Sequence, residues 1–141
     1  MAFLTVVFDL DGTLADTEMA HLAAFNHAFA EFGLDWHWDV PLYTRLLEVS
    51  GGKERIRAYW EGRGDMPREV GHGGIDSTIA RLHELKTAAY EQAVQDGAVQ
   101  MRPGVLALMA AASQAGMQLA IATTTSPVNV SNLLRRWMGP D

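Results

Sequence analysis

The feature that most constrains the fold is a short apolar run followed at once by two acidic residues. Phe3 to Phe8 is a continuous apolar, β-branched stretch, which predicts a strand buried on both faces, as in a parallel sheet. Asp9 and Asp11 follow, and Gly12 allows a sharp turn after them. Because alternate residues of an extended chain point the same way, we expect both carboxylates to face one cleft at the carboxyl end of the strand, where α/β sheets bind ligands.

A pair of adjacent carboxylates costs free energy, because like charges repel and both groups lose water. A calcium loop is excluded: an EF-hand requires Gly at position six and Glu at position twelve, and counting from Asp9 those positions hold neither. A polar turn without function remains the alternative for an Asp-x-Asp pair alone. The whole string D-L-D-G-T-L-A-D-T, directly after an apolar strand, favours a functional site. Its last Asp, Asp16, lies where a helix N-cap is expected.

The rest of the chain predicts helices and one more strand. Apolar residues recur at helical spacing, and Gly and Pro mark the boundaries. Trp36 and Trp38 bracket His37, and we interpret them as core residues rather than as ligands. No strand is predicted between the two apolar strands, so the pattern indicates two parallel strands with an all-helical insertion. The predicted helices span residues 16–32, 41–49, 53–61, 75–96, 103–115 and 127–138, and the second strand spans 119–122.

Composition limits the classes of function. The 141 residues carry a net charge of −6 without a basic run, so nucleic acid is not an expected partner. The absence of cysteine excludes disulfides, thiolate metal sites and cysteine nucleophiles. The five histidines are scattered without ligand spacing, and no apolar run approaches the length of a membrane span. The N-terminus lacks the features of a signal peptide, so we expect a soluble, cytoplasmic protein without a membrane partner.

The string from Asp9 to Thr17 resembles the first motif, D-x-D-x-[TV], of the haloacid dehalogenase (HAD) superfamily. The resemblance implies an α/β fold: a Rossmann-like HAD core with a parallel sheet, of which only the first two strands are present, and an inserted all-helical cap. The core would comprise residues 1–15 and 98–141 and would be incomplete. The cap would comprise residues 16–97.

The same resemblance implies the chemistry. Asp9 would be the nucleophile that forms an aspartyl-phosphate, and Asp11 the general acid and base. Mg²⁺ would be bound by the Asp9 carboxylate and the Asp11 backbone carbonyl, and Leu10 would belong to the phosphate-binding loop. The physical chemistry agrees, because two carboxylates in different environments can divide these roles and a metal offsets the repulsion between carboxylate and phosphate.

The second strand is followed by Thr-Thr-Thr-Ser. HAD enzymes place a hydroxyl residue at the end of this strand, and Thr123 matches that position, so its hydroxyl and the Thr124 N–H are predicted to bind phosphate. The register between the two threonines stays open. The alternative is a polar loop that caps the helix beginning at Pro127.

Two residue groups of the predicted cap are candidates for substrate binding. Glu18 and His21 share a helix face, where Glu18 would recognise substrate and His21 would steady the hinge or Asp11. A solvated polar face is the alternative. Within Gly51-Gly52-Lys53-Glu-Arg55, the glycines would free backbone N–H groups for an anion, and Lys53 and Arg55 would bind a second phosphate or a sugar oxygen. An ordinary helix-starting turn is the alternative, because the P-loop spacing is absent.

Four segments together resemble the CbbY family of HAD sugar-bisphosphate phosphatases, found in photosynthetic and autotrophic organisms. The resemblance implies a sugar phosphate such as xylulose-1,5-bisphosphate, a misfire product that inhibits Rubisco, as the small-molecule partner of a monomeric parent protein. A phosphatase is favoured over the alternative of a β-phosphoglucomutase-like phosphomutase. The segments are Asp-Thr-Glu-x-x-His (16–21), Leu-Asp-Trp-His-Trp-Asp (34–39), Gly-Gly-Lys-Glu-Arg-Ile (51–56) and Ala-Thr-Thr-Thr-Ser-Pro-Val-Asn-Val (122–130).

The resemblance also implies that the chain is truncated at its C-terminus. HAD enzymes of this type continue with further core strands, a phosphate-neutralising Lys and an acidic motif that completes the Mg²⁺ shell. The fragment is therefore expected to be weakly active or inactive, because the loss of one preorganised charge-stabilising group commonly costs about 10²–10³ in rate. A non-catalytic remnant or binding module is the alternative function.

Overall fold

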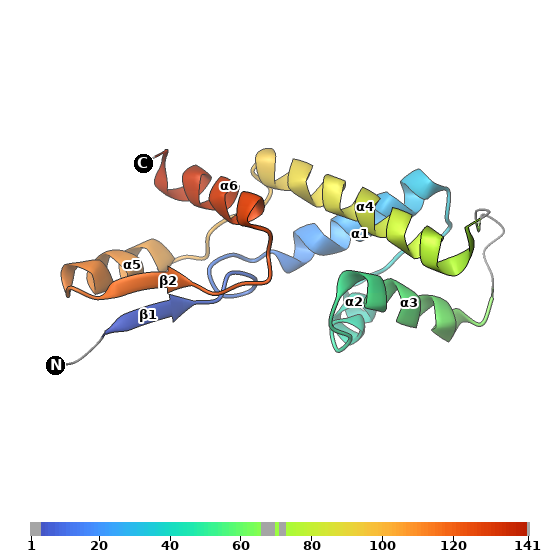
Figure 1. Ribbon diagram of the computed structural model, residues 1–141, viewed down its shortest axis with the longest axis horizontal. Helices are drawn as coiled ribbons and strands as arrows, with labels where there is room; N and C mark the ends of the chain where they lie inside the picture. Colours follow the sequence, from blue (N-terminus) through green and yellow to red (C-terminus); the bar gives the residue numbers. More distant parts are fainter. Residues whose placement is uncertain (1–3, 66–69, 71–72, 141) are drawn as a thin grey trace. The chain divides into compact units, whose positions relative to one another are not determined.

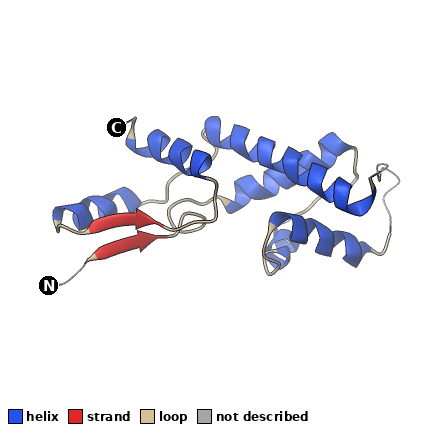
Figure 2. Ribbon diagram, viewed as in Figure 1, coloured by secondary structure: helices blue, strands red, loops and turns tan. Residues whose placement is uncertain are grey.

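The computed structural model describes residues 4–65, 70 and 73–140. Strands β1 (Thr5–Phe8) and β2 (Gln118–Ile121) pair in parallel, with Thr5 opposite Gln118 and Phe8 opposite Ile121. Figure 1 shows the two arrows side by side and pointing the same way, with α5 (Val105–Gln114) running next to them. Figure 2 separates the two strands from the helices that make up the remaining regular structure. The predicted α/β fold with a parallel pair of strands is confirmed.

The prediction that the first strand is buried on both faces is wrong for this chain. Val7 is 59% exposed and Leu4 is 51% exposed, while only Phe8 of β1 is buried. Leu119 of β2 is likewise 40% exposed. The physical reason is the small sheet: in the described part of the chain, each strand has one neighbour, so the apolar side chains lack the cover that a larger parallel sheet provides.

The chain divides into two compact units, residues Met1–Met19 with Ala93–Asp141, and residues Ala20–Gln92. We call them the strand unit and the helical unit. The predicted core and cap boundaries, at residues 16 and 97, stay predictions. Across the described residues, no helix combines the length and the apolar character that crossing a bilayer requires. The remaining helices are α1 (Glu18–Phe32), α2 (Val40–Leu46), α3 (Gly52–Arg63), α4 (Gly74–Gln95) and α6 (Pro127–Met138).

Most predicted helices are present, with small shifts at their ends. Helix α1 begins at Glu18, so Asp16 does not occupy its N-cap, and the prediction of that cap is wrong. The α2 cap is instead provided by Asp39, whose carboxylate accepts a 2.8 Å hydrogen bond from Leu42 N. Helix α3 continues to Arg63, past Glu61, where the predicted helix ended.

The helical unit is built around an aromatic cluster. Trp36 and Trp38 are buried in it, which confirms their interpretation as core residues, whereas His37 between them is exposed. The Trp38 ring lies 4.7 Å from Phe25 and 4.9 Å from Phe29, centroid to centroid. The stripe of apolar residues on α1 therefore forms core, as its spacing predicts.

Candidate active site

The loop after β1 presents Asp9 to solvent and folds tightly behind it. Asp9 is exposed, and its Oδ1 accepts a 2.8 Å hydrogen bond from Leu10 N. The Leu10 side chain is fully buried, so only its backbone is available to a phosphate. Gly12 adopts a φ of 76°, which favours glycine, and its N–H donates to Ala15 O at 2.8 Å. The loop thus holds an exposed carboxylate at the carboxyl end of β1.

Asp11 is held by two hydroxyl groups that come from different parts of the strand unit. The Thr17 hydroxyl donates to Asp11 Oδ1 and the Thr125 hydroxyl to Asp11 Oδ2, both at 2.7 Å. Thr17 is fully buried, although it immediately precedes α1. Both oxygens of the carboxylate therefore accept a hydrogen bond, and the direction in which Asp11 points is set from both sides.

The polar segment after β2 caps α6, and phosphate binding by Thr123 and Thr124 stays a prediction. Thr123 is half-buried, and its hydroxyl accepts a 3.1 Å hydrogen bond from Thr125 N. Thr124 is exposed. Ser126 caps α6 through a 3.4 Å hydrogen bond from Asn129 N, as the capping alternative predicts. Thr125 was not among the predicted site residues, because a run of hydroxyl residues does not reveal which of them reaches Asp11.

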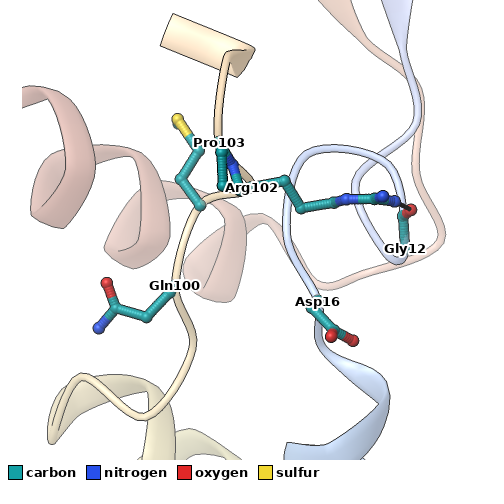
Figure 3. A pocket seen from close by; sticks show the side chains of 6 residues that line it. Gly12, Asp16, Gln100, Arg102 and Pro103 are labelled. Atoms are coloured by element: carbon teal, nitrogen blue, oxygen red, sulfur yellow. Dashed lines mark hydrogen bonds between the residues drawn. The ribbon is translucent and has the colours of Figure 1, made fainter.

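A hollow of about 360 Å³ opens beside the loop after β1. Arg102 donates from Nη1 to Gly12 O at 2.6 Å and from its backbone N to Leu14 O at 2.8 Å. Figure 3 shows the Arg102 side chain extended toward Gly12. No sequence pattern indicates this contact, because a lone Arg before Pro resembles any surface residue. The hollow is lined by Gly12, Asp16, Gln100, Met101, Arg102 and Pro103.

In the helical unit, His21 contacts a lysine that the sequence analysis did not select. The His21 ring stacks on Tyr90 at 4.1 Å, and its Nδ1 lies 3.1 Å from Lys86 Nζ. The Lys86 ammonium lies over the rings of Phe25 and Tyr90, at 5.1 and 5.3 Å from their centroids. Glu18, which belongs to the strand unit, is half-buried at the first position of α1. A long helix such as α4 has several faces, so its sequence alone does not single out Lys86.

In the predicted substrate segment at the start of α3, one cationic side chain is hydrogen-bonded to backbone carbonyls and another is exposed to solvent. The Arg55 guanidinium donates to Leu46 O at 3.0 Å and to Val49 O at 3.1 Å, so it joins α3 to the end of α2. Lys53 is exposed. Gly51 has a φ of 93° and forms the α3 N-cap position without a side-chain hydrogen bond. Lys53 is therefore better placed than Arg55 to meet a ligand.

His83 lies against the same segment. A Cβ added to Gly52 would come within 2.8 Å of the His83 ring, so this glycine permits a close approach. Burial lowers the pKa of His83 below its usual value, and the positive charges of Lys86 and Lys53 lower it further, against the opposing effect of Glu54. The positive charges of Lys53 and Lys86 thus disfavour protonation of His83, and an anion bound near His83 would weaken that effect.

The lowered pKa of His83 predicts how stability depends on pH. The folded chain binds a proton at His83 less readily than the unfolded chain does. This contribution to the free energy of unfolding is therefore fully present above the unfolded pKa of about 6.5, and it is lost as the pH falls from there through the lower pKa of the folded chain. We expect His83→Gln to reduce the loss of stability between about pH 7.5 and pH 5.5, measured by urea unfolding. The control is His37→Gln at an exposed histidine. An unchanged pH dependence in His83→Gln would contradict the assignment.

The donor atoms at the loop after β1 suit Mg²⁺ in kind. Mg²⁺ binds through oxygen, commonly through one or two carboxylates with waters and substrate phosphate completing the shell. The Asp9 carboxylate is exposed, and the Asp11 backbone carbonyl is the second predicted ligand. Within residues 4–65, 70 and 73–140, no three His, Cys, Asp or Glu side chains gather as a metal site. The loop therefore offers part of a Mg²⁺ shell.

Comparisons with known proteins identify relatives that match nearly the full length of this chain. The family model for haloacid dehalogenase-like hydrolases matches residues 6–138. The chain is 54% identical, over 96% of its length, to the plasmid protein CbbY of Cupriavidus necator, of which it covers 53%. It also matches crystal structures of CbbY from Rhodobacter sphaeroides, one with xylulose-(1,5)bisphosphate and one with phosphate, each with a TM-score of 0.80, 40% identity, and coverage of 99% of this chain and 59% of the other. The chain spans about half the length of the curated relatives it matches.

Proposed function

Because the chain belongs to the haloacid dehalogenase-like hydrolases, we propose that it carries the nucleophile and the general acid of a phosphatase acting on sugar bisphosphates. The observation that carries this proposal is the pairing of an exposed Asp9 with an Asp11 held by two hydroxyl groups, both in the loop directly after β1. The two carboxylates have different surroundings, which is the condition for dividing nucleophile and acid roles between them. The CbbY-like relatives support a phosphatase.

In the proposed reaction, a carboxylate oxygen of Asp9 attacks the phosphorus while the bond from phosphorus to the sugar oxygen breaks. Asp11 donates its proton to that leaving oxygen. Water then attacks the aspartyl-phosphate with Asp11 accepting a proton, which releases inorganic phosphate and restores the Asp9 carboxylate. The Leu10 N–H steadies Asp9, and the Thr123 hydroxyl and Thr124 N–H bind phosphate oxygens. A bound Mg²⁺ would neutralise part of the charge on carboxylate and phosphate.

The bisphosphate part of the proposal rests on the helical unit. Lys53 is exposed at the start of α3, and His83 lies against the neighbouring Gly52 and within the electrostatic influence of both Lys53 and Lys86. Such a cluster binds a phosphate group that is not transferred. The CbbY structure with xylulose-(1,5)bisphosphate contains a ligand of this class, which supports the choice of substrate. Roles for Glu18, His21, Gly51, Gly52 and Arg55 in recognising the sugar stay predictions, as do the monomeric state and the cytoplasmic location.

The experiment measures phosphate release from xylulose-1,5-bisphosphate and from xylulose 5-phosphate, with Mg²⁺ and with a chelator. We expect Lys53→Ala to raise KM for the bisphosphate about tenfold and to change KM for the monophosphate little, because one charge-assisted contact is lost. Arg81→Ala is the matched control, since Arg81 is an exposed cation paired with Glu84. Equal effects on both substrates would contradict the second phosphate site. No release from either substrate, even at high protein concentration, would contradict an activity of this chain by itself and would favour the alternative of a non-catalytic remnant.

A further inference from the structure

We propose that Thr125 is a positioning residue, one that fixes Asp11 and the Thr123 hydroxyl relative to each other. The proposal rests on the proposed function, which gives Asp11 and Thr123 their roles. Two hydrogen bonds made by Thr125 support the proposal. The Thr125 hydroxyl donates to Asp11 Oδ2 at 2.7 Å, and the Thr125 N–H donates to Thr123 Oγ1 at 3.1 Å. Thr125 itself touches no reacting atom in this proposal.

The topology explains why a residue of the second loop can reach the first. Phe8 and Ile121 end their strands opposite each other in a parallel pair, so the loops that follow leave the same edge of the sheet. Asp11 and Thr125 are separated by 114 positions in the chain, yet they meet at hydrogen-bonding distance. Thr17, six positions from Asp11, provides the local partner for the other oxygen. One carboxylate is thus held jointly by its own loop and by the loop after β2.

The second hydrogen bond sets the direction of a hydroxyl proton. Because Thr123 Oγ1 accepts from the Thr125 N–H, the proton of that hydroxyl is directed toward another acceptor, and a phosphate oxygen suits it. Neither neighbour of Thr125 takes its place, since Thr124 is exposed and the Ser126 hydroxyl caps α6. The Thr125 side chain therefore orients Asp11, the proposed acid, while the Thr125 backbone orients the Thr123 hydroxyl, the proposed phosphate ligand.

The substitution Thr125→Val tests the two hydrogen bonds separately. It removes the hydroxyl that donates to Asp11 and keeps the backbone N–H that donates to Thr123 Oγ1. Thr125→Ser restores the hydroxyl, and Thr125→Ala removes it in a smaller side chain in case the valine variant does not fold. The matched control is Thr44→Val, which removes a 2.8 Å hydroxyl contact to Val40 O in α2. Folding of each variant is checked by its amide NMR spectrum.

The first readout needs no turnover. The side-chain carboxyl ¹³C resonance of Asp11, assigned with Asp11→Asn, is recorded for all variants at one fixed pH and in the same buffer. We expect this resonance to shift in Thr125→Val and Thr125→Ala and to keep its position in Thr125→Ser and Thr44→Val. An Asp11 resonance that stays in place when the Thr125 hydroxyl is removed overturns the proposal.

The second readout is the division between kcat and KM for a phosphate monoester with Mg²⁺. We expect Thr125→Val to lower kcat about tenfold or more with little change in KM, because a misplaced acid slows the chemical step. Thr125→Ser should recover most of the rate. A rise in KM alone overturns the positioning of Asp11. If the wild-type chain releases no phosphate, the proposed function fails, and a shifted Asp11 resonance still supports the contact made by Thr125.

Discussion

Replacing Asp9 with Asn should abolish phosphate release, with a fall in kcat of at least about 10³-fold, because the proposed covalent step needs the Asp9 carboxylate as its nucleophile. The amide has nearly the shape of the carboxylate, and its oxygen can accept the hydrogen bond that Leu10 N now donates to Asp9 Oδ1. The free energy of unfolding should therefore change little. Phosphate release by the wild type and the variant is measured with Mg²⁺ under the same conditions.

Asp16→Asn provides the matched control for this experiment. Asp16 is an exposed acid of the same segment and borders the hollow beside Gly12, so the control removes one negative charge nearby. We expect it to change the rate by no more than about twofold, as exposed charges interact weakly. If Asp9→Asn retains wild-type turnover while Asp16→Asn loses it, Asp9 is not the nucleophile.

Replacing Trp38 with Ala should lower the free energy of unfolding by about 3–5 kcal/mol, the range for deleting a large aromatic side chain from a core. Trp38 is fully buried, and its ring packs on Phe25 and Phe29. Its backbone N–H and carbonyl are both bonded to the Asn26 side chain at 2.8 Å, so a collapse of the cavity would also strain these contacts. The measurement is urea unfolding followed by far-UV circular dichroism.

His37→Ala is the control for the substitution of Trp38. His37 is the exposed neighbour between the two buried tryptophans, and it occupies the same extended segment. We expect its replacement to change the free energy of unfolding by less than about 0.5 kcal/mol, as for most surface positions. A loss below about 1 kcal/mol in Trp38→Ala would show that the aromatic cluster does not dominate the stability of the helical unit.

The parts of the fold that follow from local patterns could be predicted from the sequence. Helix α6 spans Pro127–Met138, as predicted, because Pro favours the first turn and Gly139 ends the helix with a φ of 94°. The aromatic stripe of α1 forms core because its spacing is helical. Strand burial was predicted wrongly, since Val7 depends on neighbouring strands, and no local pattern reports how many strands surround it.

The candidate site was predictable only in part, for a similar reason. The motif places Asp9 and Asp11 after β1, and the strand ends there. The meeting of Thr125 with Asp11 depends on how the loop after β2 turns, and three consecutive threonines give no local signal for that turn. Arg55 appeared as available as Lys53, but backbone carbonyls near the end of α2 accept its hydrogen bonds. Such contacts depend on packing between elements rather than on the composition of one segment.

The parallel pairing of β1 with β2 has a consequence for the order of folding. The aromatic cluster of the helical unit lies within Ala20–Gln92, so it forms through contacts inside one continuous stretch of chain. The Asp11–Thr125 contact requires closure of the loop that contains that whole stretch, which costs entropy before any contact compensates for it. The geometry of the candidate site therefore depends on a contact between residues far apart in the sequence. Partial unfolding that separates the strands should erase the site while the helical unit keeps its tertiary packing.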